Sequence, residues 1–240
     1  MTGWVALGRA GEAVRAFTVQ GGDVTAWAEG PDEAAALAGL GEAPETVIRI
    51  GEGRAATLPA PVLPDGDHAL PGFTQADPPD VIDGWVRLWI AGFLAGHPNW
   101  DGVICARAGG VSHWVHVSAN EAVSAQSFLS LTLAQTLDGA AEPEMQAVAD
   151  SLSRPERLAA HLRAAQVAGD GAAITGHLIG AELAAARVYW LGQQVAVLDA
   201  APAPHAAALT AQGVPCECHD PEALIAPGLA ALGRALGLAG

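Results

Sequence analysis

The spacing of apolar residues predicts three consecutive strands at the start of the chain, joined by tight glycine turns. A helix, a fourth strand, an irregular connection rich in Pro and Gly, and a second helix then follow. The predicted ranges, in chain order, are Trp4–Leu7, Ala13–Gln20 and Asp23–Ala28 for the three strands, then Pro31–Leu40, Thr46–Ile50, 57–80 and Val81–Leu94.

The same order of elements returns in the second half of the chain, with additional helices. Strands are predicted over Val103–Arg107, Val111–Val117 and Ala122–Gln126, and helices over Ser127–Leu137, Glu144–Leu152, Arg154–Ala168 and Ala172–Trp190. Strand Gln193–Asp199, helix Pro204–Gln212, strand Val214–Cys218 and helix Pro221–Leu238 complete the list.

This duplication predicts the fold class. Strand-strand-strand-helix-strand is the outline of a ribonuclease-H-like lobe, and it occurs twice. We therefore predict an α/β protein with two such lobes, residues 1–97 (shortened) and 98–240. The architecture is that of actin-like ATPases and sugar kinases, with central mixed sheets flanked by helices.

In that architecture the first hairpin turn of each lobe faces the cleft between the lobes, and its backbone N–H groups can cradle phosphate. The candidate phosphate-binding residues are therefore those in and around the two turns. A tight hairpin needs paired glycines without any ligand, so a purely structural role stays open. The candidates are Gly8, Gly11 and Arg15 in the first lobe, and Gly109, Gly110, Ser112 and His113 in the second.

Charge and composition exclude several classes of function. The formal net charge is −15, so a nucleic-acid partner is not expected, because backbone binding needs a basic surface. All eleven basic residues are Arg, so mechanisms that need a Lys on a phosphate or a Lys Schiff base are excluded. No apolar run is long enough to span a membrane and the start does not resemble a signal peptide, which predicts a cytoplasmic protein without membrane contact.

The three cysteines are Cys105, Cys216 and Cys218, and this odd number argues for a reducing compartment rather than a disulfide framework. Cys216-Glu217-Cys218-His219 resembles half of a metal site, but no second Cys/His pair stands nearby in the sequence. We expect Cys216 and Cys218 to pack on one face of a strand, and we predict no metal.

Several segments carry the pattern of a known family. They are Leu70-Pro71-Gly72-Phe73, Pro79-Asp80-Val81-Ile82-Asp83-Gly84, Ala108-Gly109-Gly110-Val111-Ser112-His113-Trp114-Val115, and Leu178-Ile179-Gly180-Ala181-Glu182-Leu183 followed by Arg187. In order and spacing they resemble the 2-dehydro-3-deoxygalactonokinase (2-keto-3-deoxygalactonate kinase) family. The resemblance covers most of the chain, is strongest after residue 70, and is that of a divergent member.

The resemblance implies a bacterial protein of galactonate catabolism that phosphorylates a 2-keto-3-deoxy sugar acid on its terminal hydroxyl with ATP and Mg²⁺. However, the chain departs from the family pattern where phosphate and metal are handled. Gly8 stands where the family has an Asp, Gly110 replaces a Thr, and His113 replaces a Lys. Further departures are Asp83-Gly84-Trp85-Val86 for R-G-E-E, Ala125-Gln126-Ser127 for T-G-E, and Asp199-Ala200 for a G-T turn.

What remains of the family pattern is mainly architectural. Gly176, Gly180 and Ala184 recur every four residues on a predicted cleft-lining helix, which gives the helix a smooth face for close packing. Glu182 lies on the same helix. We expect Glu182 and Arg187 to serve packing, and a catalytic role for the two residues stays open.

Three hypotheses follow. In the first, the protein is a degenerate kinase, a pseudoenzyme that binds a sugar acid or another partner but has weak or no activity. In the second, it is an active kinase with a rewired site built on Glu12, Arg15, Gly109 and His113, in which case ATP and Mg²⁺ are its cofactors. In the third, it is a non-catalytic structural protein, and a homodimer is among the assemblies considered. No catalytic residue is assigned, and Glu12 is the single candidate for the missing carboxylate.

Overall fold

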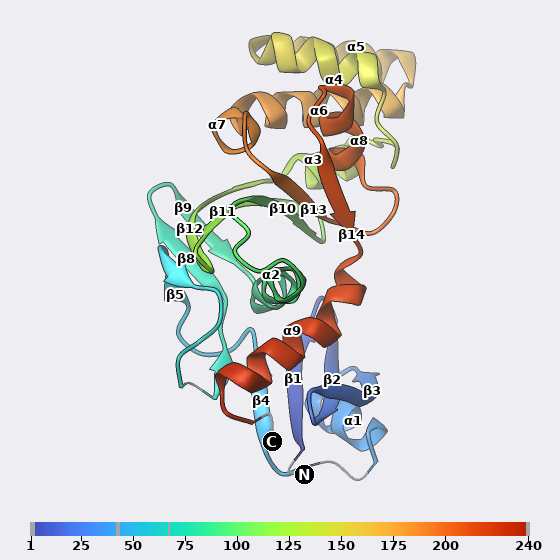
Figure 1. Ribbon diagram of the computed structural model, residues 1–240. Coiled ribbons are helices and arrows are strands. Elements are labelled where there is room, and N and C mark those ends of the chain that lie inside the picture. Colours follow the sequence, from blue (N-terminus) through green and yellow to red (C-terminus); the bar gives the residue numbers. More distant parts are fainter. Residues whose placement is uncertain (1–2, 42–43, 67, 239–240) are drawn as a thin grey trace. The chain divides into compact units, whose positions relative to one another are not determined.

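The computed structural model describes residues 3–41, 44–66 and 68–238. The chain divides into two compact units, labelled by element in Figure 1. Unit 1 comprises Met1–Trp100, Ser118–Ser124 and Pro221–Gly240, and unit 2 comprises Asp101–Val117 and Ala125–Asp220. Among the described residues, no helix is long and apolar enough to cross a membrane.

The main sheet of unit 1 has the strand order β3-β2-β1-β4-β7. Strands β1, β2 and β3 form antiparallel hairpins, and β4 and β7 add in parallel beside β1. Gly11 and Gly22 have positive φ in the two hairpin turns, a conformation that glycine adopts without strain. The elements are β1 (Trp4–Ala10), β2 (Ala13–Gln20), β3 (Asp23–Gly30), α1 (Glu33–Gly39), β4 (Val47–Ile50) and β7 (Ala69–Leu70).

The segment 57–80, which was expected to be irregular, contains several short strands. Most of them form a small sheet of order β5-β8-β9, and β7 extends the main sheet. The strands are β5 (Ala56–Thr57), β6 (Ala60–Pro61), β8 (Phe73–Ala76) and β9 (Pro79–Ile82). Because Pro79–Ile82 pairs with β8, the next helix, α2 (Gly84–Gly96), begins after the predicted Val81, where the Asp83 carboxylate accepts a hydrogen bond from the Trp85 amide.

Helix α9 (Pro221–Ala235) belongs to unit 1, although the predicted lobe boundary placed it with residues 98–240. It packs closely against α2, and glycines allow the approach. A β-carbon at Gly92 would lie 2.1 Å from the Leu224 carbonyl oxygen, and one at Gly228 would lie 2.5 Å from that of Leu88. Aromatic and aliphatic side chains of α2, α9 and the sheet form the core beneath this crossing.

The sheet of unit 2 repeats the plan of unit 1. Its order is β14-β13-β10-β11-β12, and β6 pairs with the start of β12 at residues that belong to unit 1. Strands β10 and β11 are antiparallel, whereas β13 and β14 are parallel to β10. The strands are β10 (Gly102–Ala108), β11 (Val111–Ser118), β12 (Glu121–Phe128), β13 (Val195–Leu198) and β14 (Cys216–His219).

The helices of unit 2 are more divided than the sequence pattern predicts. The predicted helix Arg154–Ala168 is a short 3-10 turn followed by α5, and the predicted helix Ala172–Trp190 is interrupted at Ala186. They are α3 (Ser130–Thr136), α4 (Met145–Ser153), η1 (Pro155–Arg157), α5 (Leu158–Ala168), α6 (Gly171–Ala185), α7 (Arg187–Trp190) and α8 (Pro204–Ala211). Figure 1 shows α4, α5 and α6 lying together in this unit.

The smooth face predicted for α6 is used for packing. A β-carbon at Gly176 would lie 2.4 Å from the Glu144 carbonyl oxygen, and one at Gly180 would lie 2.3 Å from that of Val148. Helix α4 can therefore lie directly on the backbone of α6. Both glycines serve this packing.

Candidate functional site

Near the β1–β2 turn of unit 1, the strand position where the family pattern places its acid is a glycine and has no side chain. Gly8 lies within β1, beside Ile50 of β4, and a β-carbon there would lie 2.4 Å from the Ile50 carbonyl oxygen. Glu12 is exposed in the turn, and its carbonyl oxygen accepts a hydrogen bond from Arg9 at 3.0 Å. The backbone thus leaves no room for a carboxylate at position 8.

Arg15 lies on β2 and is bound away from the turn. Its terminal nitrogens donate to both carboxylate oxygens of Glu222, at 2.8 and 2.7 Å. Its guanidinium carbon also lies 5.1 Å from the centroid of the Phe17 ring, with Trp27 and Trp85 slightly farther away. Arg15 therefore links the sheet to the first turn of α9.

The β10–β11 turn of unit 2 is closed by α3. Gly109 has φ of 61°, and the carbonyl oxygen of Gly110 accepts hydrogen bonds from the Thr132 amide at 3.0 Å and hydroxyl at 2.9 Å. A β-carbon at Gly110 would lie 2.3 Å from the Thr132 hydroxyl oxygen. The paired glycines are thus needed for the hairpin and for its contact with α3.

A buried polar cluster lies next to this hairpin, and we call Ser112, Trp114, Ser130, Glu182 and His205 the Glu182 cluster. Oxygen Oε1 of Glu182 accepts from the Ser112 hydroxyl at 2.6 Å, the Trp114 indole N–H at 2.8 Å and His205 Nε2 at 2.9 Å. Ser130 also donates to this carboxylate. The sequence placed Ser112 and Glu182 among the candidates separately, and the fold brings the two together.

Electrostatics in the Glu182 cluster favour a charged pair. Burial alone would raise the pKa of Glu182, but the His205 charge and the hydrogen bonds from His205, Ser112 and Ser130 hold it below its ordinary value. Burial likewise opposes charge on His205, but the Glu182 carboxylate and the Asp199 charge raise its pKa above 6.5. Both shifts favour the charged forms of Glu182 and His205, whose side chains lie 2.9 Å apart in the core.

A second charged pair, Arg107 with Asp199, lies beside the cluster. Arg107 Nε donates to Asp199 Oδ1, so the acid that stands in place of the family's G-T turn is paired with a cation. Burial raises the pKa of Asp199, and Arg107 opposes that rise. Within the described part of the chain, Oε2 of Glu182 and Oδ2 of Asp199 are buried without a hydrogen-bond partner.

Arg107 also lines a pocket of about 220 Å³ in unit 2. Most of the wall is small and apolar, with Gln135 and Thr175 adding polar groups. The terminal nitrogens of Arg107 make no hydrogen bond to any residue that the structure describes. The pocket therefore offers one guanidinium to a small ligand.

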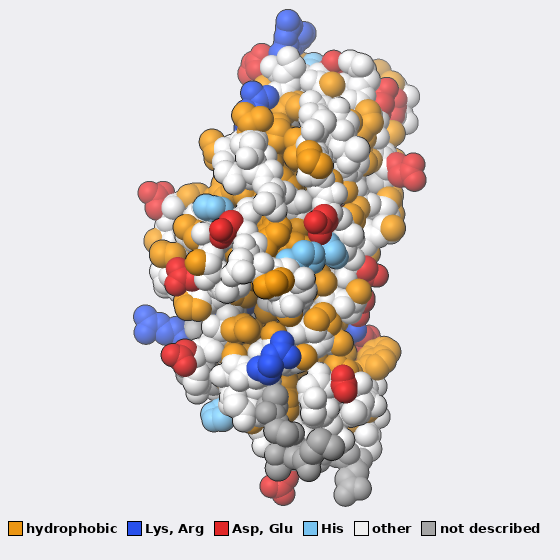
Figure 2. Space-filling model, viewed as in Figure 1, with side chains coloured by type: hydrophobic (Ala, Val, Ile, Leu, Met, Phe, Trp, Pro, Cys, Tyr) orange, Lys and Arg blue, Asp and Glu red, His pale blue; other side chains and the backbone are white. Residues whose placement is uncertain are grey.

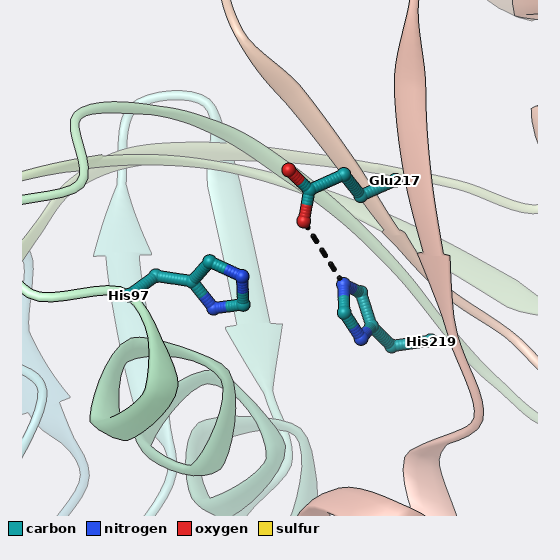
Figure 3. A group of neighbouring side chains, drawn as sticks. All are labelled: His97, Glu217 and His219. Atoms are coloured by element: carbon teal, nitrogen blue, oxygen red, sulfur yellow. Dashed lines mark hydrogen bonds and ion pairs between the residues drawn. The ribbon is translucent and has the colours of Figure 1, made fainter.

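The remaining candidates lie apart from this pocket's wall. His113 bonds through Nδ1 to the Ser127 hydroxyl at 2.6 Å, and Arg187 is exposed on α7. On β14, Cys216 and Cys218 contact carbonyl oxygens through their thiols. Glu217 and His219 of the same strand form an ion pair at 3.3 Å (Figure 3).

Sequence reasoning missed Arg107, Ser130 and His205 as members of the site. Arg107 stands two residues before the predicted glycine turn, and His205 follows the proline that opens α8. Neither position matches a motif with known chemistry. Only the three-dimensional arrangement brings them next to Glu182 and Asp199.

The residues at the two turns do not fit Mg²⁺-bound ATP. Mg²⁺ needs oxygen ligands in a nearly octahedral set, usually including a carboxylate. In unit 1 the carboxylate position is Gly8, and the turn's acid, Glu12, is exposed at its tip. In unit 2 the turn Gly109–Gly110 has no side-chain ligand, and the nearby Ser112 hydroxyl is bound to Glu182.

The repeated sheet plan and its helices define the class of this protein, the actin-like ATPase and sugar-kinase fold, as the sequence predicts. A crystal structure from Sinorhizobium meliloti, provisionally named a 2-dehydro-3-deoxygalactonokinase, matches with a TM-score of 0.79 at 20% identity, covering 97% of this chain and 99% of that one. Component A of (R)-2-hydroxyglutaryl-CoA dehydratase from Acidaminococcus fermentans matches with a TM-score of 0.54 at 12% identity, covering 100% and 99%.

Residues 39–232 match the 2-keto-3-deoxy-galactonokinase family, and the chain belongs to that family. The predicted resemblance is thereby confirmed. The match begins after the first three strands and includes residues 39–70, upstream of the segments in which the resemblance is strongest. A comparison with curated proteins gave no match.

Proposed function

We propose that this protein is a family member that has lost phosphoryl transfer and instead binds a small carboxylate, with a 2-keto-3-deoxy sugar acid as the first candidate. The observation that carries this proposal is the close approach of Gly8 to β4. A β-carbon at that position would lie 2.4 Å from a backbone oxygen, so no acid can occupy it without moving a strand.

An acid matters because phosphoryl transfer depends on positioning and charge. A carboxylate must hold the metal or accept the proton of the attacking hydroxyl, and donors must neutralise the transferred phosphoryl group. Glu12 is the acid nearest to the missing position in sequence, and it is exposed at the tip of the turn. We therefore expect no productive metal–nucleotide complex.

The alternative of an active kinase with a rewired site has less support. Arg15 is held by both oxygens of Glu222, and His113 is held by Ser127. Recruiting them to phosphate would break these contacts. Gly109 offers a backbone donor, as any hairpin turn does.

Anion binding has better support, from the pocket beside Arg107. Acidic side chains are spread over the face shown in Figure 2, and basic ones are few, so an anionic ligand needs a local cation. Arg107 is partly exposed, is positioned by Asp199 and leaves its terminal nitrogens to the pocket. A guanidinium can hold a carboxylate through two parallel hydrogen bonds. The three free cysteines fit our proposal that the protein acts in the reducing cytoplasm.

Calorimetric titration with 2-keto-3-deoxygalactonate, in the absence of nucleotide, tests this proposal. We expect saturable binding that is about tenfold weaker in Arg107→Gln, since a charge-assisted hydrogen bond contributes roughly 1.5–3 kcal/mol. Arg187→Gln removes an exposed cation from the same unit and should leave the affinity unchanged. Arg107→Lys keeps the charge but not the paired geometry and should bind with intermediate affinity. Equal affinity in Arg107→Gln and the wild type would contradict the proposal.

A further inference from the structure

A second, larger pocket lies entirely within unit 1 and includes no residue of the β1–β2 or β10–β11 turns or of the Glu182 cluster. Its volume is about 520 Å³, within the range of roughly 300–1,000 Å³ that is usual for small-molecule sites. Its walls are the C-terminal halves of α2 and α9, the segment 61–63, which begins with the last residue of β6, and Asn120 in the β11–β12 turn.

The way the two helices cross explains why this space is hollow. Helices α2 and α9 touch backbone to backbone at Gly92 and Gly228, and both continue beyond this contact. Alanines line the pocket on each helix, at positions 91 and 95 of α2 and 231 and 235 of α9. Their spacing of four residues puts each pair on one helix face, and methyl side chains cannot fill the angle between the helices.

The wall is apolar except at two side chains, Asn120 and Arg234. The Arg234 guanidinium makes no hydrogen bond or ion pair to any residue that the structure describes, whereas Arg15 and Arg49 of the same unit bind carboxylates. An arginine in the last turn of a helix is ordinarily explained by the helix dipole. The dipole does not explain why Arg234 borders a cavity whose other walls, apart from Asn120, are alanine, valine, leucine and proline.

We propose that this pocket binds a carboxylate carried on an apolar chain or ring. The apolar body would pack between the alanine faces of α2 and α9, where each buried methylene contributes about 0.8 kcal/mol. The carboxylate would be held by Arg234, with the Asn120 amide as a second donor. A hydrophilic sugar acid does not fit these walls, so the ligand differs in class from the one proposed for the pocket beside Arg107.

Calorimetry with octanoate and 1-octanol tests the proposal, because the two probes share the apolar chain and differ in charge. We expect octanoate to bind about tenfold more tightly than 1-octanol, and Arg234→Gln to remove this difference while 1-octanol binding stays constant. Ala95→Phe places a ring in the pocket and should abolish the binding of both probes. A parallel titration with 2-naphthoate decides whether a chain or a ring is preferred.

Arg54→Gln is the matched control, because Arg54 is an exposed cation of the same unit and does not line the pocket. It should leave both affinities unchanged. Octanoate binding that survives Ala95→Phe, or that Arg234→Gln does not weaken, would overturn the proposal. Arg234, Ala95 and Arg54 all belong to unit 1. A negative result with octanoate would therefore leave the sugar-acid titration of Arg107→Gln in unit 2 as an independent test.

Discussion

The first hairpins of the two units have the same backbone plan, but their polar side chains bind different kinds of partner. Each ends in a two-residue turn whose first glycine has φ near +60°, and an arginine stands two residues before that glycine. In unit 1 this arginine, Arg9, bonds to its own turn. In unit 2 the equivalent residue, Arg107, bonds to a buried acid that follows β13.

The two units also differ in the second strand of the hairpin. The second strand of unit 1 carries Arg15, whose partner Glu222 is largely exposed, whereas the second strand of unit 2 carries Ser112 and Trp114, which both bond to the buried Glu182. The same hairpin topology therefore places the carboxylate partner at the surface in unit 1 and in the core in unit 2. In this chain, the polar groups beside the second hairpin are hydrogen-bonded to one another.

The largest predicted effect is the loss of Glu182. Glu182→Ala leaves His205 buried without its counter-charge and deprives Ser112, Trp114 and Ser130 of their common acceptor. Removing one partner of a buried ion pair costs about 3–5 kcal/mol. Denaturant unfolding should show a loss of that size, and Glu182→Gln, which retains an acceptor oxygen, should lose less. A loss below about 1 kcal/mol would mean that the cluster does not stabilise unit 2.

Gly8 gives the next largest effect, in unit 1. Gly8→Ala forces a β-carbon against β4, and overpacking of this kind costs about 1–3 kcal/mol. The matched position in unit 2, in the register of the two hairpins, is Ala106, which already carries a β-carbon. Stability unchanged by Gly8→Ala, measured by denaturant unfolding, would show that β4 can move aside and that position 8 could accept a carboxylate.

The pH dependence of stability should report on His205. Its pKa is raised in the folded state, so its contribution is complete below its ordinary value of 6.5 and is lost as pH rises through the folded value. For a single titrating group the slope cannot exceed about 1.4 kcal/mol per pH unit. Glu182 and Asp199 favour the charged ring and Arg107 opposes it. His205→Gln should remove this slope, and a variant that kept the slope would contradict the assignment.

The pKa of His177 is shifted in the opposite direction from that of His205, so His177 affects a different part of the curve of stability against pH. Burial and the neighbouring His161 lower the pKa of His177, so its protonation costs stability as pH falls below 6.5. Both rings bond to the Ser151 hydroxyl, and Asp150 and Glu144 oppose the shift. The variant His177→Gln should therefore flatten the acid side of the stability curve and leave the alkaline side unchanged.

The smallest effect belongs to the exposed pair of unit 1. Glu222 is 59% exposed, so its two hydrogen bonds with Arg15 are screened by water. We expect Glu222→Gln to cost less than about 1 kcal/mol and its effect to shrink in high salt. A loss as large as that of Glu182→Ala would erase the contrast between the two units.

Much of the fold could be predicted because local signals agreed. The glycine turns and the apolar runs located the first three strands of each unit to within a few residues. The short strands between 57 and 80 could not be found, because two-residue strands depend on pairing with distant segments and carry no periodicity of their own. The placement of α9 in unit 1 follows from the Gly92–Gly228 crossing, which no local pattern reveals.

The candidate site was predicted less completely. The turn glycines, Ser112 and Glu182 stood in recognisable segments, so they were named. Arg107, Asp199 and His205 come from three separate elements, and their association depends on the parallel pairing of β10 with β13. The sequence shows Asp199 only as a departure from the family's G-T turn, because its partner Arg107 lies 92 residues away and stands in no motif.

The most direct test of the central claim is ADP formation by the purified protein with Mg²⁺, ATP and 2-keto-3-deoxygalactonate. The account predicts no ADP above the rate without protein, even at substrate concentrations that saturate binding in the calorimeter. Steady ADP formation that depends on the sugar acid and is lost in Glu12→Gln would contradict it, because phosphoryl transfer would then proceed without an acid at position 8.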